Sequence, residues 1–106
     1  MDLLAGKRIK WTFDDGPMAG VAIEHTFHAD GGVTWLLADG PHKGATVREK
    51  SYSAMKVNEK TWLVSYLAAS GHTLTVALSL DDGRMFAIGS DNGSWVPMHG
   101  RFEIVH

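Results

Sequence analysis

The stretch TWLVSYLAASGHTLTVALSL, residues 61–80, is the longest apolar run of the chain, and the fold can be worked out from it. Trp, Val, Tyr, Thr and Leu dominate both of its ends, and these residue types favour β-strands. Ala69-Ser70-Gly71 lies between the two ends, where glycine supplies the positive φ angle that a tight turn requires. The stretch therefore predicts a β-hairpin.

The two faces of this hairpin predict an oligomer. With a turn of even length, one face carries Trp62, Val64, Tyr66, Thr73, Thr75, Ala77 and Ser79. The other face then carries Leu63, Ser65, Leu67, Leu74, Val76, Leu78 and Leu80. Because both faces are largely apolar, a monomer would expose one of them, and we expect a homodimer to cover it. We expect the aromatic face to look inward and the interface to include Leu63, Leu74 and Val76 or their opposite-face neighbours, although which face lies outside is left open.

The rest of the chain predicts short antiparallel strands separated by turns. Strand patterns occur at residues 8–13, 21–28, 33–37, 84–90, 94–98 and 101–105. Alternation along the first three predicts inner faces made of Ile9, Trp11 and Phe13, of Val21, Ile23, His25 and Phe27, and of Val33, Trp35 and Leu37. Turns are predicted at Asp14-Asp15-Gly16-Pro17, Asp30-Gly31-Gly32, Asp81-Asp82-Gly83 and Asp91-Asn92-Gly93. The facing of Val47 to Val57 is left open, because two sets of side chains compete for the inner side. No apolar period of 3.6 residues persists for three turns, so we expect no helix.

About eight such strands predict an all-β fold. We expect an antiparallel up-and-down meander that closes into a small β-barrel, a single domain over residues 1–106. Closure removes the exposed edges that invite aggregation. The interior of a barrel with about eight strands is filled by side chains or holds one small ligand.

Composition excludes several classes of partner. Ten Lys and Arg against twelve Asp and Glu give a net charge of −2, with no excess of positive charge for nucleic acid or anionic lipid. The absence of cysteine excludes disulfides and thiolate chemistry and favours a reducing cytoplasm. The first residues do not have the pattern of a signal peptide, and no run of about 18 apolar residues is present to span a bilayer. We therefore expect a cytoplasmic protein with neither a nucleic-acid nor a membrane partner.

Several strings of residues resemble a known family. They are Lys10-Trp11-Thr12-Phe13-Asp14-Asp15-Gly16-Pro17-Met18-Ala19-Gly20, Asp30-Gly31, Val33-Thr34-Trp35, Val64-Ser65-Tyr66-Leu67, Ser70-Gly71-His72-Thr73-Leu74-Thr75-Val76 and Gly100-Arg101-Phe102-Glu103, with His25, Phe27 and Trp95. Over nearly the whole chain they resemble the MoaF-like family, whose members are similar to small calycin barrels. That lipocalin-like superfamily includes the phenolic acid decarboxylases, which place two Tyr, a Glu and an Arg in the barrel. The resemblance implies the barrel fold, and it carries over no catalytic residue because no motif here aligns with that set.

Aromatic side chains predict a binding interior. The candidate ligand-binding residues are Trp11, His25, Phe27, Trp35, Trp62, Tyr66 and Trp95. Flat apolar rings with a few polar groups are typical of sites for an apolar or aromatic small molecule. A packed core is the alternative. Four Trp in 106 residues favour a pocket, because each buried indole N–H needs a partner.

An enzyme is the second hypothesis. In the same cavity, His25, Glu49, Tyr52 and Tyr66 are candidate proton carriers for cofactor-free decarboxylation, isomerisation or cyclisation of an aromatic or polyketide-like substrate. We expect no cofactor and no metal, since the six His do not cluster at the spacing of metal ligands. A filled barrel that acts as a structural or interaction module is the third hypothesis.

Overall fold

The computed structural model describes residues 3–105, and every regular element in this range is a β-strand. The nine strands are β1 (Arg8–Phe13), β2 (Ala22–Phe27), β3 (Val33–Leu37), β4 (Thr46–Glu49), β5 (Tyr52–Asn58), β6 (Thr61–Leu67), β7 (Thr73–Ser79), β8 (Arg84–Ser90) and β9 (Trp95–Val105). The predicted all-β fold is confirmed. Within residues 3–105, no helix is long and apolar enough to cross a membrane.

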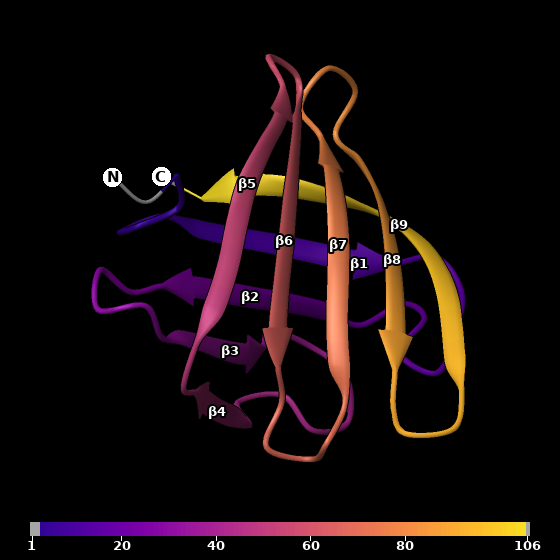
Figure 1. Cartoon of the computed structure of the whole chain (residues 1–106). Coiled ribbons are helices and arrows are strands. Elements are labelled where there is room, and N and C mark those ends of the chain that lie inside the picture. Colours follow the sequence, from indigo (N-terminus) through magenta and orange to yellow (C-terminus); the bar gives the residue numbers. More distant parts are fainter. Residues whose placement is uncertain (1–2, 106) are drawn as a thin grey trace.

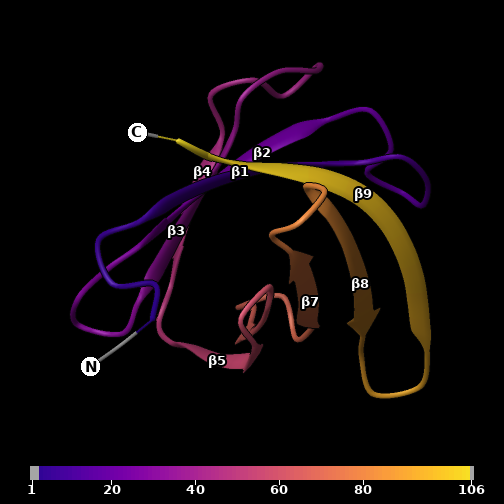
Figure 2. The same cartoon turned by 90° about the horizontal axis from the view of Figure 1, so that it is seen from above.

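The strands form one antiparallel sheet in the order β4-β3-β2-β1-β9-β8-β7-β6-β5. This is the order of an up-and-down meander in which β1 pairs with β9 and so joins the two ends of the chain. The sheet curls into a half-barrel, and its two edges are β4 and β5. Figure 1 shows β1–β4 running across the direction of β5–β8, and Figure 2 shows the sheet curling around one interior. The predicted meander is confirmed, with one side left unpaired between β4 and β5.

Strand β9 links the two halves of the sheet. Its first part pairs with β8 and its last part with β1, and Gly100 pairs with both Met85 and Phe13. A Cβ atom at Gly100 would collide with the carbonyl oxygen of Thr12 and come within 3.1 Å of the Phe13 Cα atom. Glycine therefore permits the close approach of β1 to β9. Figure 2 shows that β9 curves along its length as it passes from one half of the sheet to the other. The sequence predicted two strands here, residues 94–98 and 101–105, whereas the structure has one.

The core lies on the concave side of the sheet. The inward faces predicted for the first three strands are confirmed, since Ile9, Trp11, Phe13, Ile23, His25, Phe27, Val33 and Leu37 are buried. The opposite half contributes Val64, Val76, Leu78, Met85, Ala87 and Met98. Alternation of buried and exposed positions along these strands follows the period of two that a pleated strand imposes.

The hairpin of residues 61–80 is confirmed, but its predicted pairing is wrong. The turn between β6 and β7 comprises residues 68–72, an odd number, closed by a hydrogen bond from Ala68 N to His72 O of 2.8 Å. Trp62 therefore lies opposite Leu78, and Val64 lies opposite Val76. Apolar side chains of both strands face inward, so Leu74 and Val76 do not belong to an outer face.

The change of inner face within residues 47–57 comes from a strand break at Lys50 and Ser51, whereas the bulge of β5 lies at its far end, between Lys56 and Asn58. Strand β4 ends at Glu49, which is buried, and β5 begins at Tyr52, which packs partly buried against the core. Lys50 and Ser51 lie between them and shift the inward positions from odd to even numbers. Glu49 and Tyr52 therefore both face the interior at the open side of the sheet.

Candidate functional site

Most of the predicted site residues meet in the interior. Trp11, His25, Phe27 and Glu49 are buried, and Trp35, Tyr52, Trp62 and Tyr66 are partly buried against the core. Trp95 is the exception. It lies on the convex side of β9, opposite Ser90 of β8, and is 71% exposed. The structure therefore separates Trp95 from the other candidates.

His25 on β2 is the centre of this cluster. Its ring stacks on Trp11 of the neighbouring strand β1, with ring centroids 3.6 Å apart and planes inclined by 28°. Tyr66 on β6 approaches from the opposite half of the sheet, and its hydroxyl group forms a hydrogen bond with His25 Nε2 at 3.2 Å. Phe27 lies next along β2, 6.1 Å from the imidazole between centroids, and meets Tyr52 edge to face.

Two buried polar atoms of this cluster have no hydrogen-bond partner in the structure. They are Trp11 Nε1 and His25 Nδ1, in rings that stack on one another and are each 1% exposed. Leaving a buried donor or acceptor without a partner costs about 1–3 kcal/mol, and most such groups in proteins are satisfied. Two cases in one stacked pair of rings therefore distinguish this part of the interior from the rest of the core.

Burial sets the protonation of the His25–Tyr66 pair. Burial lowers the pKa of His25 to about 3, although the nearby backbone carbonyl of Ile23 partly opposes this effect. Burial, together with the negative charge of Glu49, raises the pKa of Tyr66. Both side chains are therefore neutral at pH 7. A histidine with so low a pKa is a weak proton acceptor, which makes it better suited to orienting a ligand than to general-base catalysis.

Glu49 joins the two halves of the sheet at the open side. Its Oε2 accepts a hydrogen bond from Trp35 Nε1 on β3 at 3.1 Å, and its Oε1 accepts one from the backbone N–H of Ala69 in the β6–β7 turn at 3.1 Å. The buried carboxylate is thus satisfied by one donor from each side. This bridging position was not predicted from the sequence, which left the facing of Glu49 open.

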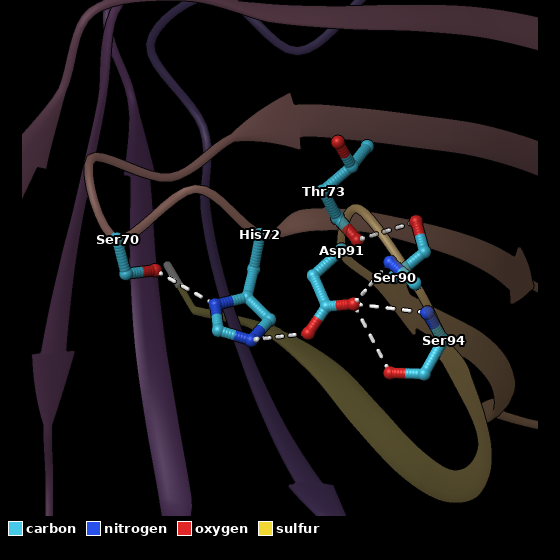
Figure 3. Close-up of polar contacts among 7 residues, drawn as sticks. Ser70, His72, Thr73, Ser90, Asp91 and Ser94 are labelled. Atoms are coloured by element: carbon cyan, nitrogen blue, oxygen red, sulfur yellow. Dashed lines mark hydrogen bonds and ion pairs between the residues drawn. The ribbon is translucent and has the colours of Figure 1, made fainter.

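A second polar cluster lies in the turns at one end of β6–β9 (Figure 3). Ser70 Oγ is 3.1 Å from His72 Nδ1, and His72 Nε2 is 3.6 Å from Asp91 Oδ2. Asp91 Oδ1 also accepts hydrogen bonds from the backbone N–H groups of Gly93 and Ser94. His72 and Asp91 connect two neighbouring turns, but both side chains are well exposed, so solvent screens the contact and it contributes little to stability. The Ser-x-His spacing was not recognised as a polar contact from the sequence.

Comparison with known proteins identifies the family and the fold. A profile of the MoaF N-terminal domain matches residues 1–93. No curated protein matches the sequence. A solved structure described as "a putative beta-lactamase from Burkholderia vietnamiensis" has a TM-score of 0.77 and 19% sequence identity, covering 97% of this chain and 96% of that one. At this identity the similarity establishes the fold alone.

Proposed function

The chain belongs to the MoaF N-terminal domain family, and we propose that it binds a small, neutral, largely apolar or aromatic molecule inside the curled sheet. The observation that supports this most directly is the pair of adjacent buried atoms without a partner, Trp11 Nε1 and His25 Nδ1. A phenylalanine at position 11 would fill the interior without an unsatisfied indole N–H group. The polar rings therefore suit a site where a ligand supplies the missing hydrogen bond.

The polar atoms define the chemistry of the ligand. An indole Nε1 can only donate, so the ligand must carry at least one hydrogen-bond acceptor. If the Tyr66 hydroxyl donates to His25 Nε2, then His25 Nδ1 also carries a hydrogen and donates. Two donors from one stacked pair of rings suit a carbonyl oxygen, which has two lone pairs. An aromatic ketone, aldehyde, ester or quinone has both this oxygen and a flat apolar body.

Charge in the interior favours a neutral ligand. Glu49 is buried and contributes the negative charge that raises the pKa of Tyr66. His25, with a pKa of about 3, does not supply a compensating positive charge at neutral pH. Bringing a second anion into this interior would cost several kcal/mol of desolvation without a partner for it. We therefore expect neutral ligands to bind more tightly than their anionic counterparts.

Access to the site requires side chains to move. Trp11 and His25 are each 1% exposed, so neither has an open path to solvent. Between β4 and β5 the sheet has no ladder of backbone hydrogen bonds, so a ligand could pass there without separating paired strands. We propose that a ligand enters there, past Tyr52 and Glu49.

Acid–base catalysis in the same interior is the second candidate. All four candidate proton carriers, His25, Glu49, Tyr52 and Tyr66, are buried or partly buried on the inner side of the sheet. However, the depressed pKa of His25 and the raised pKa of Tyr66 leave this pair neutral over the physiological range. Binding is therefore the function that these side chains support better.

We further propose a cytoplasmic location. The chain contains no cysteine, as suits a reducing compartment, and its net charge of −2 offers no attraction for anionic membranes or nucleic acid.

The test is a titration with matched neutral and anionic aromatics. We expect methyl benzoate and acetophenone to displace the neutral dye Nile red from the protein saturably, and benzoate to do so at least tenfold more weakly. Trp11→Phe should lower the affinity of the two neutral compounds about tenfold, because one hydrogen bond in a dry site is lost. Trp95→Phe, on the convex side, is the control that leaves affinity unchanged.

Two results would contradict the proposal. One is a flat titration across the panel, which would favour the filled-barrel module. The other is unchanged affinity in Trp11→Phe while the variant remains folded by circular dichroism.

A further inference from the structure

The convex face of the sheet carries different side chains over its two halves, β1–β4 and β5–β9. The face over β1–β4 is covered by ion pairs such as Arg8–Glu24 at 3.1 Å and Arg48–Asp30 at 2.6 Å. The face over β5–β9 has three rows of cross-strand neighbours, which run from Leu67 to Trp95, from Ser53 to Pro97 and from Met55 to His99. None of these positions is Asp, Glu, Lys or Arg. Charged groups reach the three rows at one border, where Asp15 pairs with His99 and the Arg84 guanidinium lies 5.4 Å from the Phe86 ring centroid. We call these three rows the neutral face.

The neutral face exposes large apolar side chains. Trp95 is 71% exposed, Leu67 66%, Met55 55%, Ile88 47% and Phe86 44%. Scattered exposed apolar residues need no explanation, but a contiguous uncharged patch on one face is typical of an interaction site.

A groove and a protruding side chain lie on this same face. The groove holds about 350 Å³ and is lined by Leu63, Thr75, Ala77, Phe86, Ile88 and Pro97. Its lining includes the small side chains of Thr75 and Ala77, and the exposed Trp95 lies on β9 two residues before Pro97. A surface that carries both a groove and an exposed indole that could fill it has the features of a self-complementary interface.

We propose that two copies of this chain associate through the neutral face, with Trp95 of each copy seated in the groove of the other. Because every contact across a two-fold axis occurs twice, a dimer would contain two such contacts between Trp95 and a groove. The sheets would then stack face to face, about 10 Å apart, as in a β-sandwich. Of the interface residues predicted from the sequence, this surface keeps Leu63 and the opposite-face neighbours Thr73 and Thr75, whereas Leu74 and Val76 face the interior.

Area and charge favour a second copy as the occupant. Strands about 4.8 Å apart and same-face residues about 6.7 Å apart give the neutral face roughly 400–500 Å² per copy, or roughly 800–1,000 Å² buried in total. This is near the lower limit for a specific complex, so we expect a dimer of micromolar affinity. An uncharged face neither repels its own copy nor selects a charged partner.

Sedimentation velocity across a concentration series tests the proposal. At about 100 µM we expect the unmodified protein to sediment at twice its chain mass of 11.6 kDa. Trp95→Ala should raise the dimer Kd about 30-fold, as removal of a central aromatic anchor does. Thr75→Arg, which fills the groove from the other side of the contact, should have a similar effect.

The controls separate this face from other modes of association. Leu36→Glu changes an apolar residue on the face over β1–β4 and should leave the dimer intact. Val57→Asp, at the β5 bulge on the sheet edge, should also leave it intact, unless copies pair edge to edge. A monomer mass for the unmodified protein, an intact Trp95→Ala dimer or dissociation by either control would overturn the proposal.

Discussion

At the scale of single residues, the neutral His25 has a consequence for stability. The folded chain holds this imidazole between Trp11 and Tyr66 with a pKa of about 3, whereas an unfolded chain binds a proton near pH 6.5. Below pH 6.5 the unfolded state therefore binds more protons than the folded state. By linkage, stability that is complete above pH 6.5 is lost as the pH falls toward 3.

We predict a loss of about 2–3 kcal/mol between pH 6.5 and 4.5 from His25, at about 1.4 kcal/mol per pH unit. Urea unfolding at half-unit intervals measures it. The pH range of the experiment ends at 4.5 because aspartates in the turns affect stability at lower pH. Backbone N–H donors lower the pKa of these carboxyl groups from an unfolded value of 3.8, and they are Asp15, Asp30, Asp82 and Asp91. Those carboxyl groups give stability above pH 3.8 that is lost at lower pH.

His25→Gln is the matched variant. It keeps a polar side chain of similar length but does not titrate, so its unfolding free energy should be nearly flat over the same window apart from the other histidines. Equal slopes in the two proteins would show that His25 is protonated without penalty in the folded state.

At the scale of elements, the pairing of β9 with β1 requires a residue without a Cβ atom at position 100. Gly100 lies where β9 passes from β8 to β1, and any side chain there meets the Thr12 carbonyl oxygen and Phe13 backbone. Backbone atoms in two paired strands cannot yield as a flexible side chain can.

We therefore predict that Gly100→Ala destabilises the fold by about 3 kcal/mol, through overpacking at the β1–β9 ladder. Gly89→Ala on β8 is the control. Its new methyl group would meet only the end of the flexible Met98 side chain, at 3.4 Å, and should cost less than about 1 kcal/mol. Thermal unfolding of both variants measures the difference, and Gly100→Ala should have the lower midpoint. Similar midpoints would contradict the explanation that β1 approaches β9 too closely for a side chain at Gly100.

The strand patterns were predictable, whereas the connections between strands were not. Alternation predicted the buried faces of β1 and β2, including Trp11 and His25, because one side of each strand is apolar. The parity of the 61–80 hairpin depends on whether its turn has an odd or even number of residues, and Ser70-Gly71 fits either. Glu49 and Tyr52 could not be placed for a similar reason, since the two-residue break at Lys50-Ser51 changes the inward parity.

At the scale of the whole molecule, the candidate site depends on long-range pairing. Alternation placed His25 on an inward face, but its contact with Tyr66 spans 41 residues and exists only because the sheet curls β6 over β2. The unpaired atoms of Trp11 and His25 could not be predicted either, because a missing hydrogen bond is a property of the packed interior. The exposed position of Trp95 follows from its register with β8.

Because β4 and β5 are not paired with each other, we predict that their amides are less protected from hydrogen exchange than those of the central strands, which NMR can measure. Strands β1 and β9 are paired on both sides, so their amides should exchange at the rate of global unfolding. In β4 and β5 only the N–H groups that point toward β3 and β6 have ladder partners, so protected and unprotected amides should alternate along each strand. Adding a neutral aromatic ketone should slow exchange in β4 and β5 most, because that is where we propose the ligand enters. Uniform protection along β5 in the free protein would mean that β4 and β5 pair and that the sheet is a closed barrel.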